Sequence, residues 1–549
     1  MGLLRWEFLA VRTFSKSSYL IFKQCPKYFW YYINNRASIP EHDKRAKFNF
    51  ALGHIVGELA KLCFSGGLEV GYDNDFEQNL MRTENLLKER KPLFEAGVLS
   101  KNEFFNVYSR ADILDPVGQH SWDIIEVKSS TGVKDVNLYD VAFQKYCYER
   151  AGIKVNKCYL MYINNQYLRR GGIDVNSLFA KADVTEMVDK ICPHIKNDLK
   201  QMLKVATDEN FILQSGESAP EDGVGKFCEN PFNCPLKPVC WKNVDKNSIY
   251  SLYSVTQKVI NRLVLQNIKL ICEIPDDFEG MNLKQKIQIS CVKNSKPHID
   301  RNAIAEFISK VSFPVCFLDF ETFASPVPLI DLTKPYQGIP FQFSLHVLED
   351  PDGYPRHLSF LASGNSDPRA QLLKSLKENF LSVKPDEDRF DGSIIVYNES
   401  FERSILRDLA VFDPSYADWI YMISSKIVDL YEPFRNFNYY NKLQNGSASV
   451  KKVLPALTDK SYENLEISNG DAANISFLEK SDLWDRFIKE YKLKDKFKAV
   501  YNNYSGTEGN EDEEKIIEKL RQDLHNYCKL DTEGMVDIYR ELVSIAGKF

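Results

Sequence analysis

The chain of 549 residues lacks three features that would narrow its class at once. It has no apolar run of about 18 residues, the length that a membrane-spanning helix needs. Its first residues, MGLLRWEFLAVRTF, contain no long apolar segment of the kind that marks a secretory signal. Its net charge of −6 gives no overall basic surface. We therefore expect a cytoplasmic protein, not bound to a membrane, in which any nucleic-acid partner meets a local basic groove.

The composition is that of a globular protein, with 44% apolar and 27% charged residues. A chain of this length is too long for one ordinary hydrophobic core, so we expect two or three domains. The twelve cysteines are not expected to form a disulfide framework, because the cytosol keeps thiols reduced. Clustered cysteines therefore indicate a metal first.

Pattern and composition divide the chain into two α/β regions. Residues 14–241 mix helix and strand patterns and end in a cysteine-rich segment. Residues 242–312 contain no chemical motif and are interpreted as a connecting region. A second α/β pattern fills residues 313–549 and begins with the strand VCFLDFETF. No internal repeat is visible, so we expect two different domains.

The stretch SRADILDPVGQHSWDIIEVKSS predicts a hairpin that carries two acids and a lysine. Glu126 and Lys128 lie two apart on a strand and share a face, and Asp112 comes from the preceding strand. Two carboxylates can hold a hard cation through oxygen, and a neighbouring lysine can orient or deprotonate a water molecule. An ordinary exposed strand also carries such triplets, so the triplet alone does not identify a site.

Further residues around this hairpin complete an ordered series. His54 precedes it in GHIVGELA, and Gln144 and Tyr148 follow it in QKYCY, four apart on one helix face. The series H…D…ExK…QxxxY resembles the PD-(D/E)XK nucleases of the RecB/AddB branch, which have a restriction-endonuclease-like fold. The resemblance implies that His54, Asp112 and Glu126 bind metal. It also implies that Lys128 is catalytic together with the two acids Asp112 and Glu126. Gln144 and Tyr148 would face nucleic acid.

Three cysteines recur at steps of six in FCENPFNCPLKPVCW, where prolines exclude a regular helix. At this spacing Cys228, Cys234 and Cys240 do not return to one helix face, and it differs from the C-x₂₋₄-C pair usual for zinc. Cys25, in QCPKYFW, offers a fourth thiol. The arrangement resembles the iron–sulfur clamp of AddB-type and CRISPR-associated RecB-like nucleases. That resemblance implies a 4Fe-4S cluster on these four cysteines, with Zn²⁺ as the alternative.

The strand VCFLDFETF carries two carboxylates in an otherwise apolar run. Asp319 and Glu321 share one face of this strand, and Leu318 and Phe320 share the other. Two acids on one face can hold two divalent ions about 3.5–4 Å apart, the separation that in-line phosphodiester cleavage uses. The rest of such a site must come from later parts of the chain.

Two later segments offer the missing groups. Asn398 and Glu402 lie at a predicted strand-to-helix junction, and Tyr527 and Asp531 lie four apart on one face of the final helix. The order DxE…NxxFE…YxxxD resembles the DEDD exonucleases of the tyrosine-bearing subgroup, which have an RNase H-like fold and remove nucleotides from 3′ ends. The resemblance implies that Tyr527 positions the attacking water and that four acids bind metal, two of them also catalytic. The four acids are Asp319 and Glu321, which are the catalytic pair, with Glu402 and Asp531.

Glu402 departs from the aspartate that is usual at its position in that family. Its extra methylene group can shift a bound metal, so the sequence supports the fold of this region more firmly than its activity.

Between these motifs, the segment DLYEPFRNFNYYNKLQNGSASVKKVLPAL mixes basic and aromatic residues. Arg435, Lys451 and Lys452 can contact a nucleic-acid backbone while nearby aromatic rings stack on bases. We expect Asn398 to join these contacts. The same aromatic rings can instead pack as a lid, and the sequence leaves both roles open.

Several segments, among them FLDFETF, PYQGIPFQFSLH and GSASVKKVLPAL, resemble the bacterial domain-of-unknown-function family DUF2779. The sequence as a whole predicts a nuclease that uses Mg²⁺ or Mn²⁺ to cleave DNA, or alternatively RNA, with a C-terminal 3′→5′ exonuclease domain. The alternative is a nucleic-acid-binding or assembly subunit of a defence or mobile-element complex, with one or both sites inactive. Either role implies nucleic acid, and in the second case other proteins, as partners.

Overall fold

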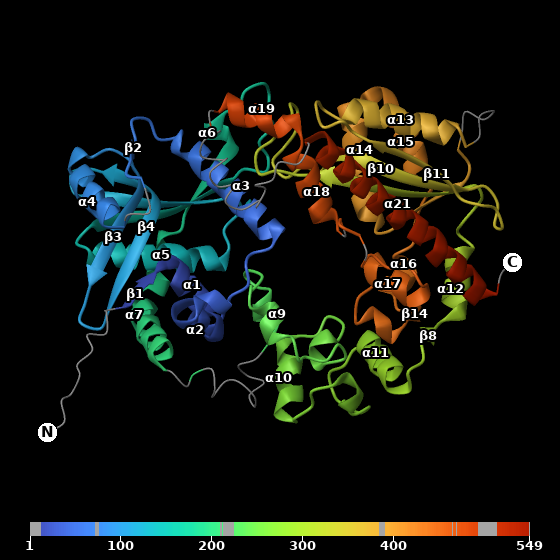
Figure 1. Ribbon diagram of the computed structural model, residues 1–549, viewed down its shortest axis with the longest axis horizontal. Helices are drawn as coiled ribbons and strands as arrows, with labels where there is room; N and C mark the ends of the chain where they lie inside the picture. Colours follow the sequence, from blue (N-terminus) through green and yellow to red (C-terminus); the bar gives the residue numbers. More distant parts are fainter. Residues whose placement is uncertain are drawn as a thin grey trace. The chain divides into compact units, whose positions relative to one another are not determined.

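The computed structural model describes residues 12–71, 76–208, 211, 224–383, 390–463, 465–467, 469–491, 493 and 513–547 (Figure 1). Two compact units divide the chain. Among the described residues, unit 1 comprises those up to Lys242 together with Ser325–Tyr336. Unit 2 comprises Asn243–Ala324, Gln337–Lys494 and Ser505–Phe549, so the expected connecting region lies within it from residue 243 onward. Both units combine sheets and helices, which confirms the mixed α/β class.

Unit 1 is built on a mixed sheet with the strand order β2-β3-β4-β5-β6-β7, and β1 pairs with β4. The predicted hairpin is present as β4 and β5, which pair antiparallel through a turn where Gly118 has a φ of 55° that favours glycine. The bounds are β1 (Arg12–Ser15), β2 (Leu68–Glu69), β3 (Leu93–Lys101), β4 (Phe105–Val117), β5 (Ser121–Lys128), β6 (Lys154–Ile163) and β7 (Phe179–Asp183).

Helices cover this sheet and share its core. The rings of Tyr19 and Phe143 stack with their centroids 4.9 Å apart, which packs the first helix of the unit on the helix that joins β5 to β6. The helices are α1 (Lys16–Gln24), α2 (Pro26–Asn34), α3 (Lys44–Lys61), α4 (Phe76–Leu86), α5 (Asp135–Arg150), α6 (Val175–Leu178), α7 (Thr185–Thr207) and α9 (Lys237–Cys240).

Unit 1 also includes the stretch Ser325–Tyr336, which the sequence places after the acidic strand of unit 2. Arg169 anchors this stretch: its Nη1 donates to the carbonyl oxygen of Pro328 at 3.0 Å, and its backbone N–H donates to that of Thr333 at 3.1 Å. The stretch is therefore part of unit 1 by its contacts.

Unit 2 is built on a second mixed sheet with the strand order β11-β10-β9-β12-β13. β9, β10 and β11 pair antiparallel, whereas β12 pairs in parallel with β9 and with β13. The bounds are β9 (Val315–Phe323), β10 (Ile339–Leu348), β11 (Arg356–Leu361), β12 (Ser393–Val396) and β13 (Ile427–Asp429), with a separate pair of β8 (His298–Ile299) and β14 (Tyr439–Tyr440).

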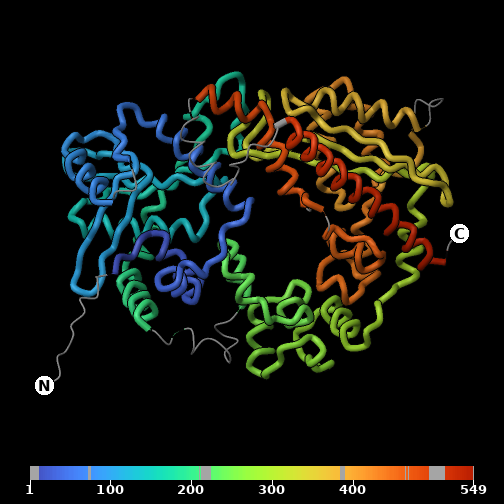
Figure 2. The backbone as a smooth tube through the Cα atoms, in the orientation of Figure 1, coloured from blue at the N-terminus to red at the C-terminus, as the bar shows by residue number. Residues whose placement is uncertain are grey.

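The two faces of this sheet have different partners. Leu318 and Phe320 of β9 belong to a core shared with three helices, α13 (Arg369–Leu381), α14 (Glu399–Phe412) and α15 (Ala417–Ser424). The long helix α21 (Glu513–Ala546) packs on the other face, where the rings of Phe317 and Tyr539 lie 5.8 Å apart. Figure 2 follows this last helix, in red, across the yellow strands β10 and β11. The acids of β9 therefore face α21.

The remaining helices of unit 2 surround this sheet or form a smaller core of their own. That smaller core gathers around α10 (Gln257–Leu265) and α11 (Leu283–Asn294). The others are α12 (Arg301–Ile308), α16 (Glu432–Arg435), α17 (Val450–Leu457), α18 (Gly470–Glu479) and α19 (Asp482–Glu490). Within the described part of the chain, none of the helices has both the length and the apolar character to cross a membrane.

Candidate functional site

Three carboxylates meet in unit 2 where β9 lies against α21. Asp319 and Glu321 come from one face of the strand, and Asp531 comes from the helix. The ligand oxygens of these three side chains all lie within 4.8 Å of one another. Among the described residues, this is the one group of three or more acidic, histidine or cysteine side chains that meets this distance. The structure thus brings together three of the four acids that the sequence singled out.

Burial and mutual repulsion make negative charge unfavourable at this cluster. Burial, followed by repulsion from Asp531 and Glu321, raises the pKa of Asp319 well above its usual range. Burial and the neighbouring Asp531 also raise the pKa of Glu321. The pKa of Asp531 is raised by burial, although Tyr462 opposes this by donating a hydrogen bond to its Oδ1 at 2.6 Å. A bound divalent cation would offset this repulsion.

Glu402, the fourth acid, lies nearby in the first turn of α14. It is buried, and its charge contributes to the raised pKa of both Asp319 and Glu321. Burial, with a smaller effect of Asp429, raises its own pKa to about 8. Within the described residues its Oε2 is buried without a hydrogen-bond partner. A buried carboxylate oxygen in that state is available to a cation.

Tyr527 and Lys451 lie beside the same acids. Burial, then the charges of Asp531 and Glu321, raise the pKa of the Tyr527 phenol, which therefore stays protonated at neutral pH. The Nζ of Lys451, on α17, lies 5.1 Å from the centroid of the Tyr527 ring and 5.5 Å from that of Tyr462. Sequence patterns did not indicate Tyr462, because it comes from an irregular segment outside the motif that contains Tyr527.

The other predicted nucleic-acid contacts of unit 2 have different surroundings. Asn398 precedes α14 with a φ of 78°, and its backbone N–H donates to Asp429 Oδ1 at 2.9 Å. Lys452 and Arg435 are exposed, and the Arg435 guanidinium lies 5.5 Å from the ring centroid of Tyr431. The aromatic residues of this segment are buried, which favours the packing role that the sequence left open. They are Phe434, Phe437, Tyr439 and Tyr440.

A network of ion pairs occupies the predicted site in unit 1. Lys128 Nζ lies 2.6 Å from Glu126 Oε1 and 2.7 Å from Asp140 Oδ2. Lys16 Nζ lies 2.9 Å from the same Glu126 oxygen and 3.6 Å from Asp140 Oδ1. The Nε2 of Gln144 donates to Glu126 Oε2 at 2.5 Å and to Asp140 Oδ1 at 3.0 Å. Both oxygens of Glu126 are thus engaged by side chains of the protein.

Opposite charges determine the ionisation of this network. Burial works to lower the pKa of Lys16 and Lys128, but Asp140 and Glu126 outweigh it and raise both values. Burial and Asp112 work to raise the pKa of Glu126, but the two lysines outweigh them and lower it. The sequence did not indicate Lys16 or Asp140. Lys16 is the first residue of α1, and a capping box between Ser15 and Ser18 fixes the start of that helix, which the serine pattern in the sequence could have suggested.

The other predicted residues of unit 1 lie around this network. Asp112 Oδ2 accepts a hydrogen bond from the backbone N–H of Val127 at 2.8 Å, and burial raises its pKa. His54 lies on α3 and is exposed. Tyr148 is fully buried, and its hydroxyl donates to the carbonyl oxygen of Ala96. A direct contact of Tyr148 with nucleic acid stays a prediction, whereas its packing in the core is observed.

The four predicted cluster cysteines are neighbours in unit 1. Gln24 Nε2 donates to the carbonyl oxygen of Phe227 at 2.9 Å, which holds the cysteine-rich segment against the start of α2. Burial, and then the charges of three other thiols, raise the pKa of Cys234 to about 12. Those three thiols belong to Cys25, Cys228 and Cys240. The structure therefore brings the first cysteine beside the other three.

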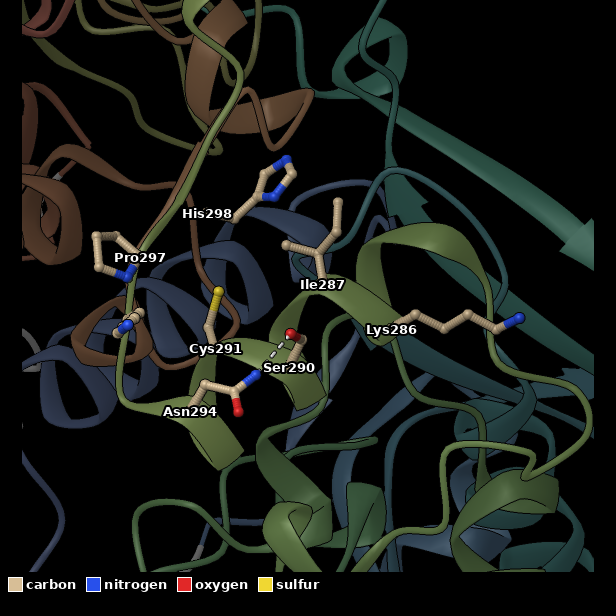
Figure 3. Close-up of a pocket in the computed structure, with 8 residues that line it drawn as sticks. Lys286, Ile287, Ser290, Cys291, Asn294, Pro297 and His298 are labelled. Carbon is tan, nitrogen blue, oxygen red and sulfur yellow. Dashed lines mark hydrogen bonds between the residues drawn. The ribbon is translucent and has the colours of Figure 1, made fainter.

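A cavity of about 660 Å³ lies elsewhere in unit 2, beside α11 and β8 (Figure 3). Figure 3 shows Cys291 and His298 on its wall, with a hydrogen bond between the side chains of Asn294 and Ser290 at 3.2 Å. Lys286 and Lys296 add positive charge. None of the residues that line this cavity belongs to the predicted sites.

Part of this site lies within a stretch that matches a known family model. Residues 316–449 match the family model described as "Domain of unknown function (DUF2779)". The DUF2779 match contains Asp319, Glu321 and Glu402. It ends before Lys451. It supports the resemblance to this family, and the division into two nuclease domains stays a prediction.

Two curated proteins are similar over a short stretch of the chain. "Uncharacterized protein MG366 homolog" from Mycoplasma pneumoniae is 30% identical over 172 residues, which cover 29% of this chain and 25% of that protein. "Uncharacterized protein MG366" from Mycoplasma genitalium is 28% identical over 169 residues, which cover 29% of this chain and 25% of that protein. The matched stretch thus spans a quarter of the length of each relative.

A solved structure described as "Crystal structure of SSO0001" shares 14% sequence identity and covers 38% of this chain and 87% of that chain. Its TM-score is 0.21, which is too low to support an argument about the fold.

Proposed function

We propose that this protein is a metal-dependent nuclease that hydrolyses phosphodiester bonds, with DNA favoured over RNA as the substrate. The observation that carries the proposal is the buried cluster of Asp319, Glu321 and Asp531, whose ligand oxygens lie within 4.8 Å of one another. Ionised carboxylates at this distance repel one another, and a bound cation would relieve that repulsion. Carboxylate oxygens are hard ligands, so the donor set suits Mg²⁺ or Mn²⁺.

The side chains around the cluster have the chemistry that 3′→5′ exonuclease action needs. When bound, the divalent metal supplies a water molecule of lowered pKa and stabilises the charge that develops on the phosphate. Asp319, Glu321 and Asp531 hold the cation, and Glu402 offers a further buried oxygen. The neutral phenol of Tyr527 can orient a water molecule through a hydrogen bond. Lys451 supplies positive charge beside the acids, where a phosphate group would lie.

For unit 1 we propose a second nuclease site, in which Lys128 acts with Asp112, Glu126 and His54. One observation favours the alternative, that unit 1 binds nucleic acid or assembles with other proteins without cutting. Both oxygens of Glu126 already accept hydrogen bonds from Lys16, Lys128 and Gln144. A metal at Glu126 would compete with these partners for the lone pairs of the carboxylate.

We further propose that Cys25, Cys228, Cys234 and Cys240 hold a 4Fe-4S cluster. A tetrahedral zinc ion with Zn–S bonds of about 2.3 Å places its sulfur ligands about 3.8 Å apart. The charges of Cys25, Cys228 and Cys240 act on the thiol of Cys234, so the four side chains lie near one another. Four neighbouring thiols suit an iron–sulfur cluster, and a zinc ion is the alternative.

A substrate panel tests the nuclease proposal. Single- and double-stranded DNA and RNA, labelled at the 5′ or 3′ end, are incubated with the full-length protein and Mg²⁺ or Mn²⁺. A 3′→5′ exonuclease shortens 5′-labelled strands in a ladder and releases the label from 3′-labelled strands as a mononucleotide.

Matched variants assign the activity to a unit. Asp319→Asn keeps the shape of the side chain and should reduce the ladder by about 10²–10³-fold, because it removes an electrostatic contribution to the reaction. Lys128→Met should leave the ladder unchanged and remove any cleavage that depends on unit 1. Absence of cleavage of every substrate by the wild-type protein would refute the proposal.

A further inference from the structure

A chain of buried polar side chains connects the sheet of unit 2 to α21. Thr532 Oγ1 lies 2.6 Å from Ser344 Oγ and 2.7 Å from Nδ1 of His346, both on β10. Ser344 Oγ in turn lies 2.9 Å from Nε2 of His357 on β11. Thr532 is 0% exposed, Ser344 1% and His346 3%. The proposed nuclease chemistry uses none of these residues, so their burial needs another reason.

Neutral histidines complete this chain. The rings of His346 and His357 stack with their centroids 4.5 Å apart. Burial, followed by the charge of the other ring, lowers the pKa of His346 to about 3. Burial, followed by the neighbouring His525, lowers the pKa of His357 to about 4. Each neutral ring has one N–H and one acceptor nitrogen, so the two hydroxyl groups between them can form a continuous line of hydrogen bonds.

The position of this chain relates it to the acid cluster. Ser344 pairs directly with Asp319 in the β9–β10 ladder, so the two side chains emerge on the same face of the sheet. Thr532 follows Asp531 in α21. The hydrogen bond between Ser344 and Thr532 therefore joins the immediate neighbours of two acids of the cluster.

A second hydrogen bond fixes the same helix at another point. Gln342 pairs with Glu321 in the same ladder, and its Nε2 donates to the carbonyl oxygen of Leu524 in α21 at 3.0 Å. Two attachments, about two helical turns apart, determine both the position of α21 along the sheet and its rotation about its own axis. The rotation decides where the side chain of Asp531 points.

We propose that Thr532, through Ser344 and His346, is a positioning residue that holds Asp531 at the correct distance from Asp319 for a divalent cation. The inference rests on the proposed function of the same site. Residues behind metal ligands orient those ligands, and their loss typically weakens metal binding by about 10–100-fold. Thr532 contributes in this way without contacting the cation itself.

The test measures metal binding directly on the full-length protein without nucleic acid. Thr532→Val keeps the shape of the side chain and removes its hydroxyl, whereas Thr532→Ser keeps the hydroxyl. Mn²⁺ is titrated and followed by electron paramagnetic resonance, and the binding that Asp319→Asn abolishes is assigned to the cluster. We expect Thr532→Val to weaken this binding by about 10–100-fold and Thr532→Ser to restore it to nearly the wild-type value.

Kinetics and a second variant separate positioning from damage to the fold. For Thr532→Val, we expect the Mn²⁺ concentration at half-maximal nuclease activity to rise while the rate at saturating Mn²⁺ changes little. Ser344→Ala removes the same hydrogen bond from the strand and should weaken Mn²⁺ binding in the same way, so the test stands if Thr532→Val fails to fold.

The outcomes are distinguishable. Wild-type affinity for Mn²⁺ in a folded Thr532→Val or Ser344→Ala protein overturns the positioning role and leaves the proposed function intact. If Asp319→Asn does not reduce the Mn²⁺ binding of the wild-type protein, the metal site is overturned, and the positioning role with it.

Discussion

Lys16 carries the second positive charge of the ion-pair network in unit 1. It shares one oxygen of Glu126 with Lys128, at 2.9 and 2.6 Å respectively. Two cations on one carboxylate oxygen explain why the pKa of Glu126 is lowered although the side chain is buried. The balance of a buried network depends on every member, so removal of one cation leaves an uncompensated charge.

We expect Lys16→Met to lower the free energy of unfolding by about 1–3 kcal/mol at pH 7. Because the folded pKa of Glu126 lies below its unfolded value of about 4.3, its stabilising contribution is present above that pH and is lost as the pH falls through the folded pKa. The difference between Lys16→Met and the wild type should therefore shrink in acid. Urea denaturation at pH 7 and pH 3.5 measures it, with the exposed Lys452→Met as the control. An equal difference at both pH values would contradict this account.

The pKa of Glu402 is shifted in the opposite direction to that of Glu126. Its pKa is raised to about 8, so the folded protein binds a proton there that the unfolded chain has lost. Stability in the absence of metal should therefore fall as the pH rises from about 4.5 to 8 and stay level above this range. The same residue is expected to favour metal binding, because its buried oxygen is available to a cation.

Glu402→Gln should thus stabilise the metal-free protein at pH 8 by at least about 1 kcal/mol, with little effect at pH 4.5. The same variant should weaken Mn²⁺ binding. Denaturation in EDTA at the two pH values, followed by Mn²⁺ titration, checks both signs. Glu399→Gln, in the same helical turn, is the matched control. A destabilised Glu402→Gln protein at pH 8 would mean that the carboxylate has a structural partner.

At the scale of elements, one face of the strand β9 packs in the core and the other carries the acids. The alternation in VCFLDFETF predicted this division, and it is confirmed: Leu318 and Phe320 pack in the core with α13, α14 and α15. The helical spacing of Tyr527 and Asp531 also follows from the sequence, since both lie on α21. Local periodicity is enough to predict such elements and the face that each residue occupies.

Local periodicity does not predict contacts between segments that are distant in the sequence. Tyr462 meets Asp531, and Lys16 meets Glu126, only because the whole unit folds around them. Neither residue belongs to the catalytic motifs that the sequence indicated. The same holds for Thr532, whose partner Ser344 lies on a strand that is buried along its whole length.

Neighbouring residues of β9 should respond to substitution in opposite ways. Phe320→Ala leaves a cavity in the core and should cost about 3–5 kcal/mol of unfolding free energy. Asp319→Asn replaces a buried acid whose ionisation is unfavourable, so it should be neutral or stabilising in the absence of metal. Urea denaturation of both variants in EDTA at pH 7.5 makes the comparison. A strongly destabilised Asp319→Asn protein would show that the acid supports the fold rather than a cation.

At the scale of the whole molecule, four cysteines from distant parts of the sequence of unit 1 lie near one another. Cys25 lies at the start of α2, and its partners lie near the end of the unit. A group held by all four thiols would close a loop of nearly the whole unit, which restricts the unfolded chain strongly.

We expect protein purified without oxygen to be brown and to contain iron. Cys25→Ser should lose most of this iron and visible absorption, and unit 1 should become sensitive to protease. Cys272→Ser, at an exposed position, is the control and should keep both. Iron and zinc analysis alongside absorption spectroscopy decides the point, because a colourless protein with stoichiometric zinc would refute the cluster.

The stretch Ser325–Tyr336 limits how the chain can be divided into its two units. The chain leaves β9, contributes this stretch to unit 1, and returns to unit 2 at Gln337. A fragment that ends at Lys242 would lack the carbonyl groups that Arg169 binds. Recombination that replaced unit 2 with a foreign domain would therefore leave unit 1 without the stretch Ser325–Tyr336. No cut at a single point of the chain is therefore expected to separate the two units intact.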